Sequence, residues 1–179
     1  KAGDGLNVCF NPEFLREGTS VEDYHNPPFT VIGAAIYLTG SHTWANLQDI
    51  GRPGDPPFPW GEYLDFLASS NHNFMRLWMF EQPARACWTD DLIVFDPLPW
   101  ARTGPGLAQD GKPRFDLKIW NPVYFDRLRQ RLIEAGRRGI YCAVMLFQGW
   151  SLSVNGKGLD PWPVHPFNAQ NNVNGVSGA

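Results

Sequence analysis

The chain has 179 residues and a mass of 20.2 kDa, which is enough for one ordinary domain or for two small ones. Its 15 basic and 18 acidic residues are spread evenly, and a net charge of −3 offers no basic stripe to nucleic acid. The longest apolar run, residues 140–147, is far shorter than the roughly 20 residues of a membrane-spanning helix, so we expect neither nucleic acid nor a membrane as a partner.

The first 35 residues predict little regular structure. Short strands are expected at residues 6–10 and 30–32, with a turn or helix starting at Asn11 and Pro12. Glu13 and Glu17 are four residues apart and would share a helix face. Without further information, two acids on a solvated turn near a helix start are the simplest interpretation.

The next segment has the pattern of alternating strands and helices. Residues 36–39 predict a strand closed by a turn with His42 and Trp44, and a loop rich in Pro and Gly follows at 52–59. Apolar residues at helical spacing predict a helix at 60–70, and residues 74–80 predict a buried strand. Five prolines between residues 81 and 120 indicate a 40-residue loop, and loops of that length are usually functional.

The strongest local prediction is a helix over residues 122–138. Asn121 suits its N-cap and Pro122 its first position, and Phe125, Leu128, Leu132 and Ala135 form the expected buried stripe. Residues 140–147 then predict an apolar strand of a parallel sheet covered on both faces. A second loop follows and contains His165, Asn171 and Asn172.

The order of strands and helices from residue 36 onward predicts the α/β class. Ligands of such folds bind at the carboxyl ends of the parallel strands, just after which His42, Trp44, Glu81, Gln148 and Trp150 lie in the sequence. Trp78, within the predicted strand at 74–80, is a further candidate for contact with substrate. A complete (β/α)8 barrel needs about 200 residues or more. We therefore expect an incomplete barrel of about three β/α units, whose exposed sheet edges favour self-association.

Aromatic residues make up 14% of the chain, and several of its eight tryptophans lie in predicted loops. Indole rings beside amide and carboxylate groups suit sugars, because a pyranose offers an apolar C–H face together with hydroxyls. Tryptophans that only hold loops in place are an equally good interpretation of any single one. Carbohydrate is the expected partner.

Residues 36–176 contain seven ordered motifs that resemble the cellulase-like and apiosidase-like glycoside hydrolases of the β/α-barrel class. They include YLTGSHTW at 37–44, NFMRLW at 73–78 followed by Glu81, VMLFQGW at 144–150 and HPFN at 165–168 followed by Asn171 and Asn172. The resemblance implies a retaining mechanism with two carboxylates. It also implies that both catalytic carboxylates lie beyond this chain, so the catalytic residues are unknown here.

Residues 5–33 resemble a different family. The string NPEFLREGTS at 11–20, followed by NPP at 26–28 and TVIG at 30–33, is similar to a signature of UDP-glucose and GDP-mannose dehydrogenases. The resemblance implies that Glu13, Phe14, Leu15, Arg16 and Glu17 line a nucleotide-sugar site. The GxGxxG turn that binds NAD in that family is missing, and so is its thiol nucleophile.

The two patterns meet without a linker, which indicates a joined chain with residues 1–34 from a dehydrogenase and 35–179 from a glycoside hydrolase. The main hypothesis is a catalytically incomplete glycoside hydrolase fragment. The alternatives are a fragment of an NAD-dependent 6-dehydrogenase and a non-catalytic carbohydrate-binding fragment. The first family implies an exported or periplasmic protein and the second a cytoplasmic one.

Several candidate residues have more than one interpretation. Glu81 could act as an acid, contact substrate or pair with Arg76, and His42 could contact substrate or cap a turn. Asn171 and Asn172 either line a site or form an Asn-rich turn. The three cysteines have no CxxC spacing and no histidine has partners at metal spacing, so we expect no metal, and no cofactor unless the dehydrogenase alternative holds.

Overall fold

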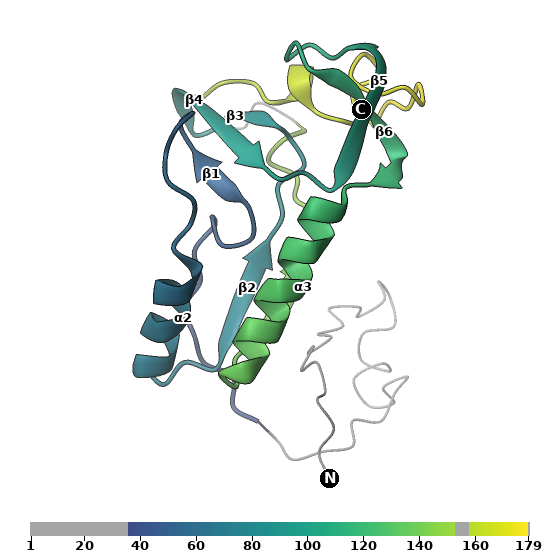
Figure 1. Cartoon of the computed structure of the whole chain (residues 1–179). Coiled ribbons are helices and arrows are strands. Elements are labelled where there is room, and N and C mark those ends of the chain that lie inside the picture. The colour runs from purple at the N-terminus through teal and green to yellow at the C-terminus, as the bar shows by residue number, and fades with distance from the viewer. Residues whose placement is uncertain (1–35, 153–157, 179) are drawn as a thin grey trace, which may run out of the picture.

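The computed structural model describes residues 36–152 and 158–178, and the elements predicted for residues 1–35 lie outside them. Figure 1 shows two helices, α2 (Trp60–Ser69) and α3 (Pro122–Arg137), beside the strand β2 (Phe74–Trp78). The strand β7 (Tyr141–Met145) pairs with β2 in parallel, from Phe74 opposite Tyr141 to Trp78 opposite Met145. These four elements form the α/β part of the chain.

Both predicted helices are confirmed, because local signals define them. Asn121 is the N-cap of α3, and its side chain accepts a hydrogen bond from Val123 N at 3.1 Å. Gly139 takes the left-handed conformation after the last turn, with φ 71°. The predicted stripe needs one correction, because Phe125 is exposed and the neighbouring Tyr124 is buried in its place.

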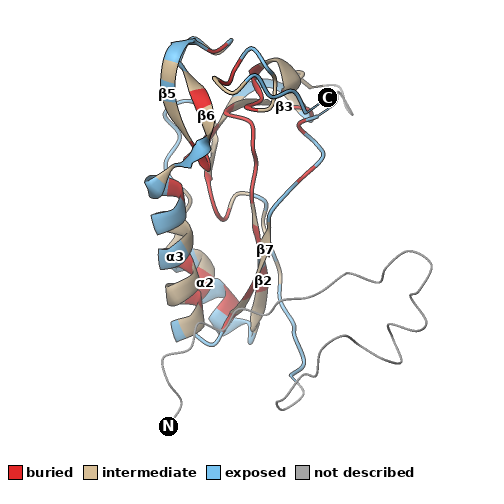
Figure 2. Ribbon diagram, turned by 90° about the vertical axis from the view of Figure 1, so that its right-hand side faces the viewer, coloured by how far each residue is buried: buried red, intermediate tan, exposed pale blue. Residues whose placement is uncertain are grey.

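A buried arginine joins the two helices. Arg131 of α3 lies with its guanidinium 4.9 Å from the ring centroid of Trp60, at the start of α2, and also donates to Asn46 O. Burial lowers the pKa of Arg131 to about 10. Figure 2 shows α2 and α3 on the same side of β2 and β7, so the two helices cover one face of the parallel pair.

The strand predicted at residues 36–39 does not form. The backbone there meets β2 only at its start, where Thr39 O accepts from Asn73 N at 2.8 Å and from Phe74 N at 3.1 Å. Gly40 is required at this contact, because a Cβ atom would lie 1.7 Å from Phe74 O. The parallel sheet of the described residues therefore has two strands.

Two side-chain amides continue along the same edge of β2. Asn46 donates to Arg76 O and accepts from Trp78 N at 3.2 Å. Gln48 donates to Phe80 O at 2.9 Å and accepts from Phe80 N at 2.6 Å. The amides thus satisfy the backbone groups that a neighbouring strand would otherwise satisfy.

The predicted 81–120 loop is wrong, since this segment supplies four strands. The strand β4 (Thr89–Asp96) pairs antiparallel with β1 (Asp49–Gly51) and with β3 (Ala84–Ala86). The strands β5 (Trp100–Leu107) and β6 (Pro113–Trp120) pair with each other. A short 3₁₀ helix (Trp162–Val164) and the following chain pack beside them, and Phe115 N donates to Asn171 O at 2.9 Å.

The buried residues form two apolar clusters, one for each half of this architecture. The first lies between the helices and the parallel pair and includes Leu64, Leu67, Met75, Leu77 and Cys142. The second lies among the antiparallel strands and includes Phe80, Phe95, Leu98, Trp100 and Phe115. Phe80, directly beyond β2, belongs to the second cluster, so the chain leaving the parallel pair enters the antiparallel part.

Candidate functional site

An aromatic cavity of about 330 Å³ lies past the carboxyl ends of the two parallel strands, lined by Trp44, Phe80, Trp88 and Trp150. Phe80 follows β2, Trp150 follows β7, and Trp88 lies between β3 and β4. Phe80 is buried, whereas Trp44, Trp88 and Trp150 are 51%, 51% and 47% exposed. Three indoles are therefore accessible around a buried phenyl ring, which is an arrangement suited to a flat apolar ligand surface.

Neighbouring aromatic rings hold two of these tryptophans. Trp44 meets Trp78 in an edge-to-face contact with ring centroids 4.6 Å apart, and the ring centroids of His42 and Trp44 are 5.9 Å apart. Trp88 meets Phe80 at 5.9 Å. His42 is exposed, and the indole N–H of Trp78 is buried with no hydrogen-bond partner in the described part of the chain.

A buried polar cluster, made of Glu81, Gln82, Gln148 and Ser151, lies next to the cavity residues in the sequence. The side-chain nitrogen of Gln148 is 2.9 Å from Glu81 Oε2, 3.2 Å from Gln82 Oε1 and 2.7 Å from Ser151 Oγ. All four side chains are buried. The cluster therefore joins the chain after β2 to the chain after β7.

The polar cluster also positions one wall of the cavity. Gln148 Oε1 accepts a hydrogen bond from the backbone N–H of Trp150 at 2.7 Å. The same amide group that contacts Glu81 thus fixes the backbone that carries the Trp150 indole. A change at Glu81 can reach the cavity through this one side chain.

Burial raises the pKa of Glu81 to about 7, and its hydrogen bonds to Gln148 and Ser151 act in the opposite direction but more weakly. A carboxyl group with such a pKa can hold a proton at neutral pH and could donate it. No second carboxylate is among its partners in the described residues. Arg76, the predicted pairing partner, is exposed and forms no ion pair within residues 36–152 and 158–178.

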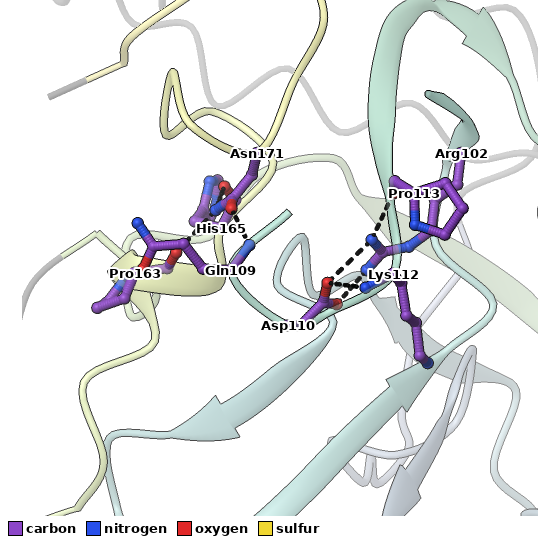
Figure 3. A network of polar contacts seen from close by, with 8 residues as sticks. All are labelled: Arg102, Gln109, Asp110, Lys112, Pro113, Pro163, His165 and Asn171. Atoms are coloured by element: carbon purple, nitrogen blue, oxygen red, sulfur yellow. Dashed lines mark hydrogen bonds and ion pairs between the residues drawn. The ribbon is translucent and has the colours of Figure 1, made fainter. Parts of the chain in front are cut away.

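His165, Asn171 and Asn172 lie in a different place, beside β5 and β6 rather than at the cavity. Figure 3 shows Asn171 between two loops: its Oδ1 accepts from Gln109 N at 2.8 Å, and its Nδ2 donates to Pro163 O at 2.8 Å and to His165 O at 2.9 Å. Asn172 donates to three backbone carbonyls and accepts from two backbone N–H groups. The side-chain amides of Asn171 and Asn172 thus form their hydrogen bonds with backbone groups, as expected of an Asn-rich turn.

The His165 ring stacks on Trp162, with centroids 5.4 Å apart, and is fully buried. Its Nδ1 accepts from Phe167 N at 3.0 Å, and its Nε2 has no partner among the described residues. Burial lowers the pKa of His165 to about 4, so the ring is neutral near pH 7. A neutral, enclosed imidazole has a structural role in this arrangement.

Of the residues predicted to follow the parallel strands, Glu81, Gln148 and Trp150 follow β2 and β7, whereas His42 and Trp44 follow residues 36–39, where no strand forms. Trp44 lines the cavity, and Trp78, a candidate from within the predicted strand, packs against it. Four residues of the cavity and the polar cluster were not predicted: Phe80, Gln82, Trp88 and Ser151. Phe80 and Gln82 flank Glu81 in the sequence, so their closeness to the strand end could have identified them. Trp88 lies inside the segment that was predicted to be a loop.

Three further predictions concern absences or undescribed residues. Glu13, Phe14, Leu15, Arg16 and Glu17 lie outside the described residues. Within residues 36–152 and 158–178, no three His, Cys, Asp or Glu side chains are grouped to hold a metal ion. In the same ranges, no helix has the length and apolar character to cross a membrane.

Comparison with known proteins finds relatives for about a third of the chain. UDP-glucose 6-dehydrogenase AglM of Haloferax volcanii is 45% identical over 60 residues, which cover 32% of this chain and 14% of that protein. The GDP-mannose 6-dehydrogenases of Azotobacter vinelandii and Pseudomonas putida are 61% and 43% identical over 53 residues, or 30% of this chain. The chain spans only 12% of the length of each of these two relatives.

No protein-family model matches the chain, and no solved structure matches it. The similarity to UDP-glucose and GDP-mannose 6-dehydrogenases is thus confirmed for a segment of the chain. The comparisons give no support to the glycoside hydrolase resemblance of residues 36–176.

Proposed function

We propose that this chain combines a fragment of a UDP-glucose or GDP-mannose 6-dehydrogenase with a part that binds carbohydrate without cleaving it. The dehydrogenase proposal rests on identities of 43% to 61% to named 6-dehydrogenases over 53 to 60 residues. The signature at residues 11–20 would supply side chains of the nucleotide-sugar site, Glu13 and Arg16 among them. The whole enzyme's activity would need parts of the relatives that this chain does not span.

The described residues do not fit NAD. The cofactor's pyrophosphate needs a glycine-rich turn from a parallel strand into a helix. Here β2 leads into the antiparallel strand β3, and α3 follows β6 through Asn121 and Pro122 without a glycine. We therefore derive no oxidoreductase step for this chain.

Calorimetry tests the dehydrogenase proposal directly. Titration of UDP-glucose and GDP-mannose into the full chain is expected to show weak binding that is reduced by Arg16→Ala, because a guanidinium is a strong phosphate ligand. Titration of NAD is expected to show none. Absence of binding for both nucleotide sugars would overturn a ligand-binding role for this segment.

The carbohydrate proposal rests on one observation, the three accessible indoles of Trp44, Trp88 and Trp150 around one cavity. The apolar face of a pyranose can stack on such rings, and Gln148 of the buried polar cluster holds the backbone of Trp150 in place. The finer hypothesis of an incomplete glycoside hydrolase barrel is compatible with the parallel pair and its two helices. It remains a proposal, supported by sequence motifs.

Tryptophan fluorescence tests the carbohydrate proposal. Plant oligosaccharides are expected to shift the emission of the wild type, and Trp150→Ala is expected to abolish that shift. Trp120→Ala is the matched control, because Trp120 is an exposed tryptophan on β6 that does not line the cavity. A wild type that no oligosaccharide affects would exclude carbohydrate binding.

A parallel hydrolysis assay separates binding from catalysis. Because Glu81 has no second carboxylate among its partners in the described residues, aryl glycosides and polysaccharides are expected to be cleaved no faster than in buffer. Turnover that Glu81→Gln abolishes would contradict the proposed incomplete site.

A further inference from the structure

The lining of the aromatic cavity distinguishes between two parts of a ligand. Its four residues, Trp44, Phe80, Trp88 and Trp150, are all aromatic and uncharged. The only polar atom that any of these side chains offers is the N–H group of an indole, which donates and cannot accept. A sugar ring held by its hydroxyls needs several donors and acceptors. The interior of the cavity therefore suits an apolar group better than it suits a hydroxylated ring.

The polar cluster beside the cavity in the sequence hydrogen-bonds mainly to itself. The side-chain nitrogen of Gln148 contacts Glu81, Gln82 and Ser151 at 2.9, 3.2 and 2.7 Å. Its Oε1 accepts from the backbone N–H of Trp150 at 2.7 Å, so both ends of the Gln148 amide are in use. These buried groups are engaged with the protein, and the contacts of a ligand in the cavity fall to the aromatic rings.

The rings around the cavity are inclined to one another. Phe80 and Trp88 meet with centroids 5.9 Å apart at 61°, and Trp44 meets Trp78 at 67°. Inclined rings present an edge beside a face. Aromatic pairs prefer edge-to-face or offset-stacked contacts with centroids about 4.5 to 7 Å apart, so a further ring can join this arrangement without changing it.

The cavity has room for such a ring and an opening for what the ring carries. An apolar cavity of about 150 Å³ can hold benzene, and this one measures about 330 Å³. Phe80 is its buried wall, whereas Trp44, Trp88 and Trp150 are each about half exposed. A ring bound among these side chains is therefore not enclosed, and a polar substituent can extend from it into solvent.

We propose that the cavity binds an aryl group attached to a sugar, such as the phenyl ring of an aryl glycoside, and that the sugar lies at the exposed indoles. The sugar part rests on the proposed carbohydrate binding, whereas the aryl part stands on the cavity alone. Aromatic rings also attract organic cations. The four lining side chains include no carboxylate to balance such a charge, so a neutral ring is the better fit.

Calorimetry with two glucosides tests the aryl group. Phenyl β-glucoside is expected to bind the full chain at least about ten-fold more tightly than methyl β-glucoside, because only the first buries a phenyl ring. This advantage is expected to be lost in Trp150→Ala and kept in Trp120→Ala, since Trp120 is exposed on β6 and does not line the cavity. Equal affinities for the two glucosides would overturn the aryl proposal and leave carbohydrate binding standing.

Nuclear magnetic resonance of the wild type tests the position of the ring without any substitution. Phenol alone is expected to shift the indole N–H signals of Trp44, Trp88 and Trp150 and to leave that of Trp120 unchanged. Binding of phenol together with equal affinity for phenol and phenyl β-glucoside would support the aryl site and contradict the carbohydrate proposal. Phenol that shifts none of the three signals, or choline that shifts them when phenol does not, would overturn the aryl site.

Discussion

Gln148 donates a hydrogen bond to Glu81 at 2.9 Å, and this contact joins the segments that follow the two parallel strands. Gln148 also accepts from the Trp150 backbone, so one amide side chain connects a buried carboxyl group to the wall of the aromatic cavity. The stability of this connection depends on the proton of Glu81.

Glu81→Gln should change how stability depends on pH. Burial raises the pKa of Glu81 from 4.5 to about 7, so between these values the folded chain keeps a proton that the unfolded chain loses. The contribution of Glu81 to the free energy of unfolding is therefore highest below pH 4.5 and is lost as pH rises through 7, by on the order of 3 kcal/mol. Urea unfolding of both proteins across this range should show that the stability of the variant rises with pH relative to that of the wild type. An unchanged slope would mean that Glu81 is hydrated in the folded chain.

His165→Phe should have the opposite effect on the pH profile. Burial lowers the pKa of His165 from 6.5 to about 4, so the unfolded chain takes up a proton in this range before the folded chain does. The contribution of His165 to stability is present above pH 6.5 and is lost as pH falls through 4. Its slope opposes that of Glu81, so Glu81→Gln should gain stability as pH rises and His165→Phe should lose it. Two single variants with parallel pH profiles would contradict this assignment.

Asn121→Ala should weaken the start of α3. The Asn121 side chain accepts from Val123 N at 3.1 Å and donates to Leu98 O at 2.9 Å, and removal of an N-cap costs about 1 to 2 kcal/mol. Asn121→Asp keeps the cap oxygen and loses the donor, so it should be destabilised less. Chemical denaturation of the three proteins measures this order. Equal losses in both variants would assign the effect to the Leu98 contact rather than to the cap.

Asn172→Ala should be among the most destabilising single changes outside the apolar clusters. Asn172 is buried and its amide group makes five hydrogen bonds to backbone, so truncation leaves several buried groups unpaired at about 1 to 3 kcal/mol each. Gln170→Ala, two residues away and exposed, is the matched control and should change stability by less than about 0.5 kcal/mol. Thermal unfolding followed by circular dichroism measures both. Similar melting temperatures for the two variants would show that the turn does not depend on the Asn172 amide.

The helices and the parallel strands could be predicted because their signals are local. Asn121, Pro122 and Gly139 mark both ends of α3, and the apolar run at residues 140–147 contains β7. The four strands between residues 81 and 120 could not be predicted, because prolines in a sequence usually indicate a loop. In the structure Pro113 begins β6, and Pro97 and Pro99 separate β4 from β5. Prolines at strand ends leave the ladder intact, and Pro105, inside β5, lies where the register with β6 shifts between Arg102 and Leu107.

One part of the site could be predicted from the sequence by a rule of sheet topology, and the other part depends on tertiary packing. Glu81 and Gln148 follow parallel strands, and such positions meet at one edge of a sheet, so their proximity was predictable. Trp88 joins them only because β3 and β4 turn back toward Phe80. Asn171 and Asn172 carry residue types that suit a binding site, yet their positions between loops use every amide group for the backbone. Residue type alone does not distinguish these two uses.

The amides that close the outer edge of β2 make this region sensitive to chemical ageing. Asparagine and glutamine are thermolabile side chains, and deamidation of Asn46 or Gln48 would replace a donating NH₂ group with a carboxylate oxygen. The carbonyl of Arg76 or Phe80 would then face a negative charge in place of its donor. A protein sample stored warm would therefore lose the side-chain hydrogen bonds along this edge of β2 one amide at a time. Its fold and mass would remain almost unchanged.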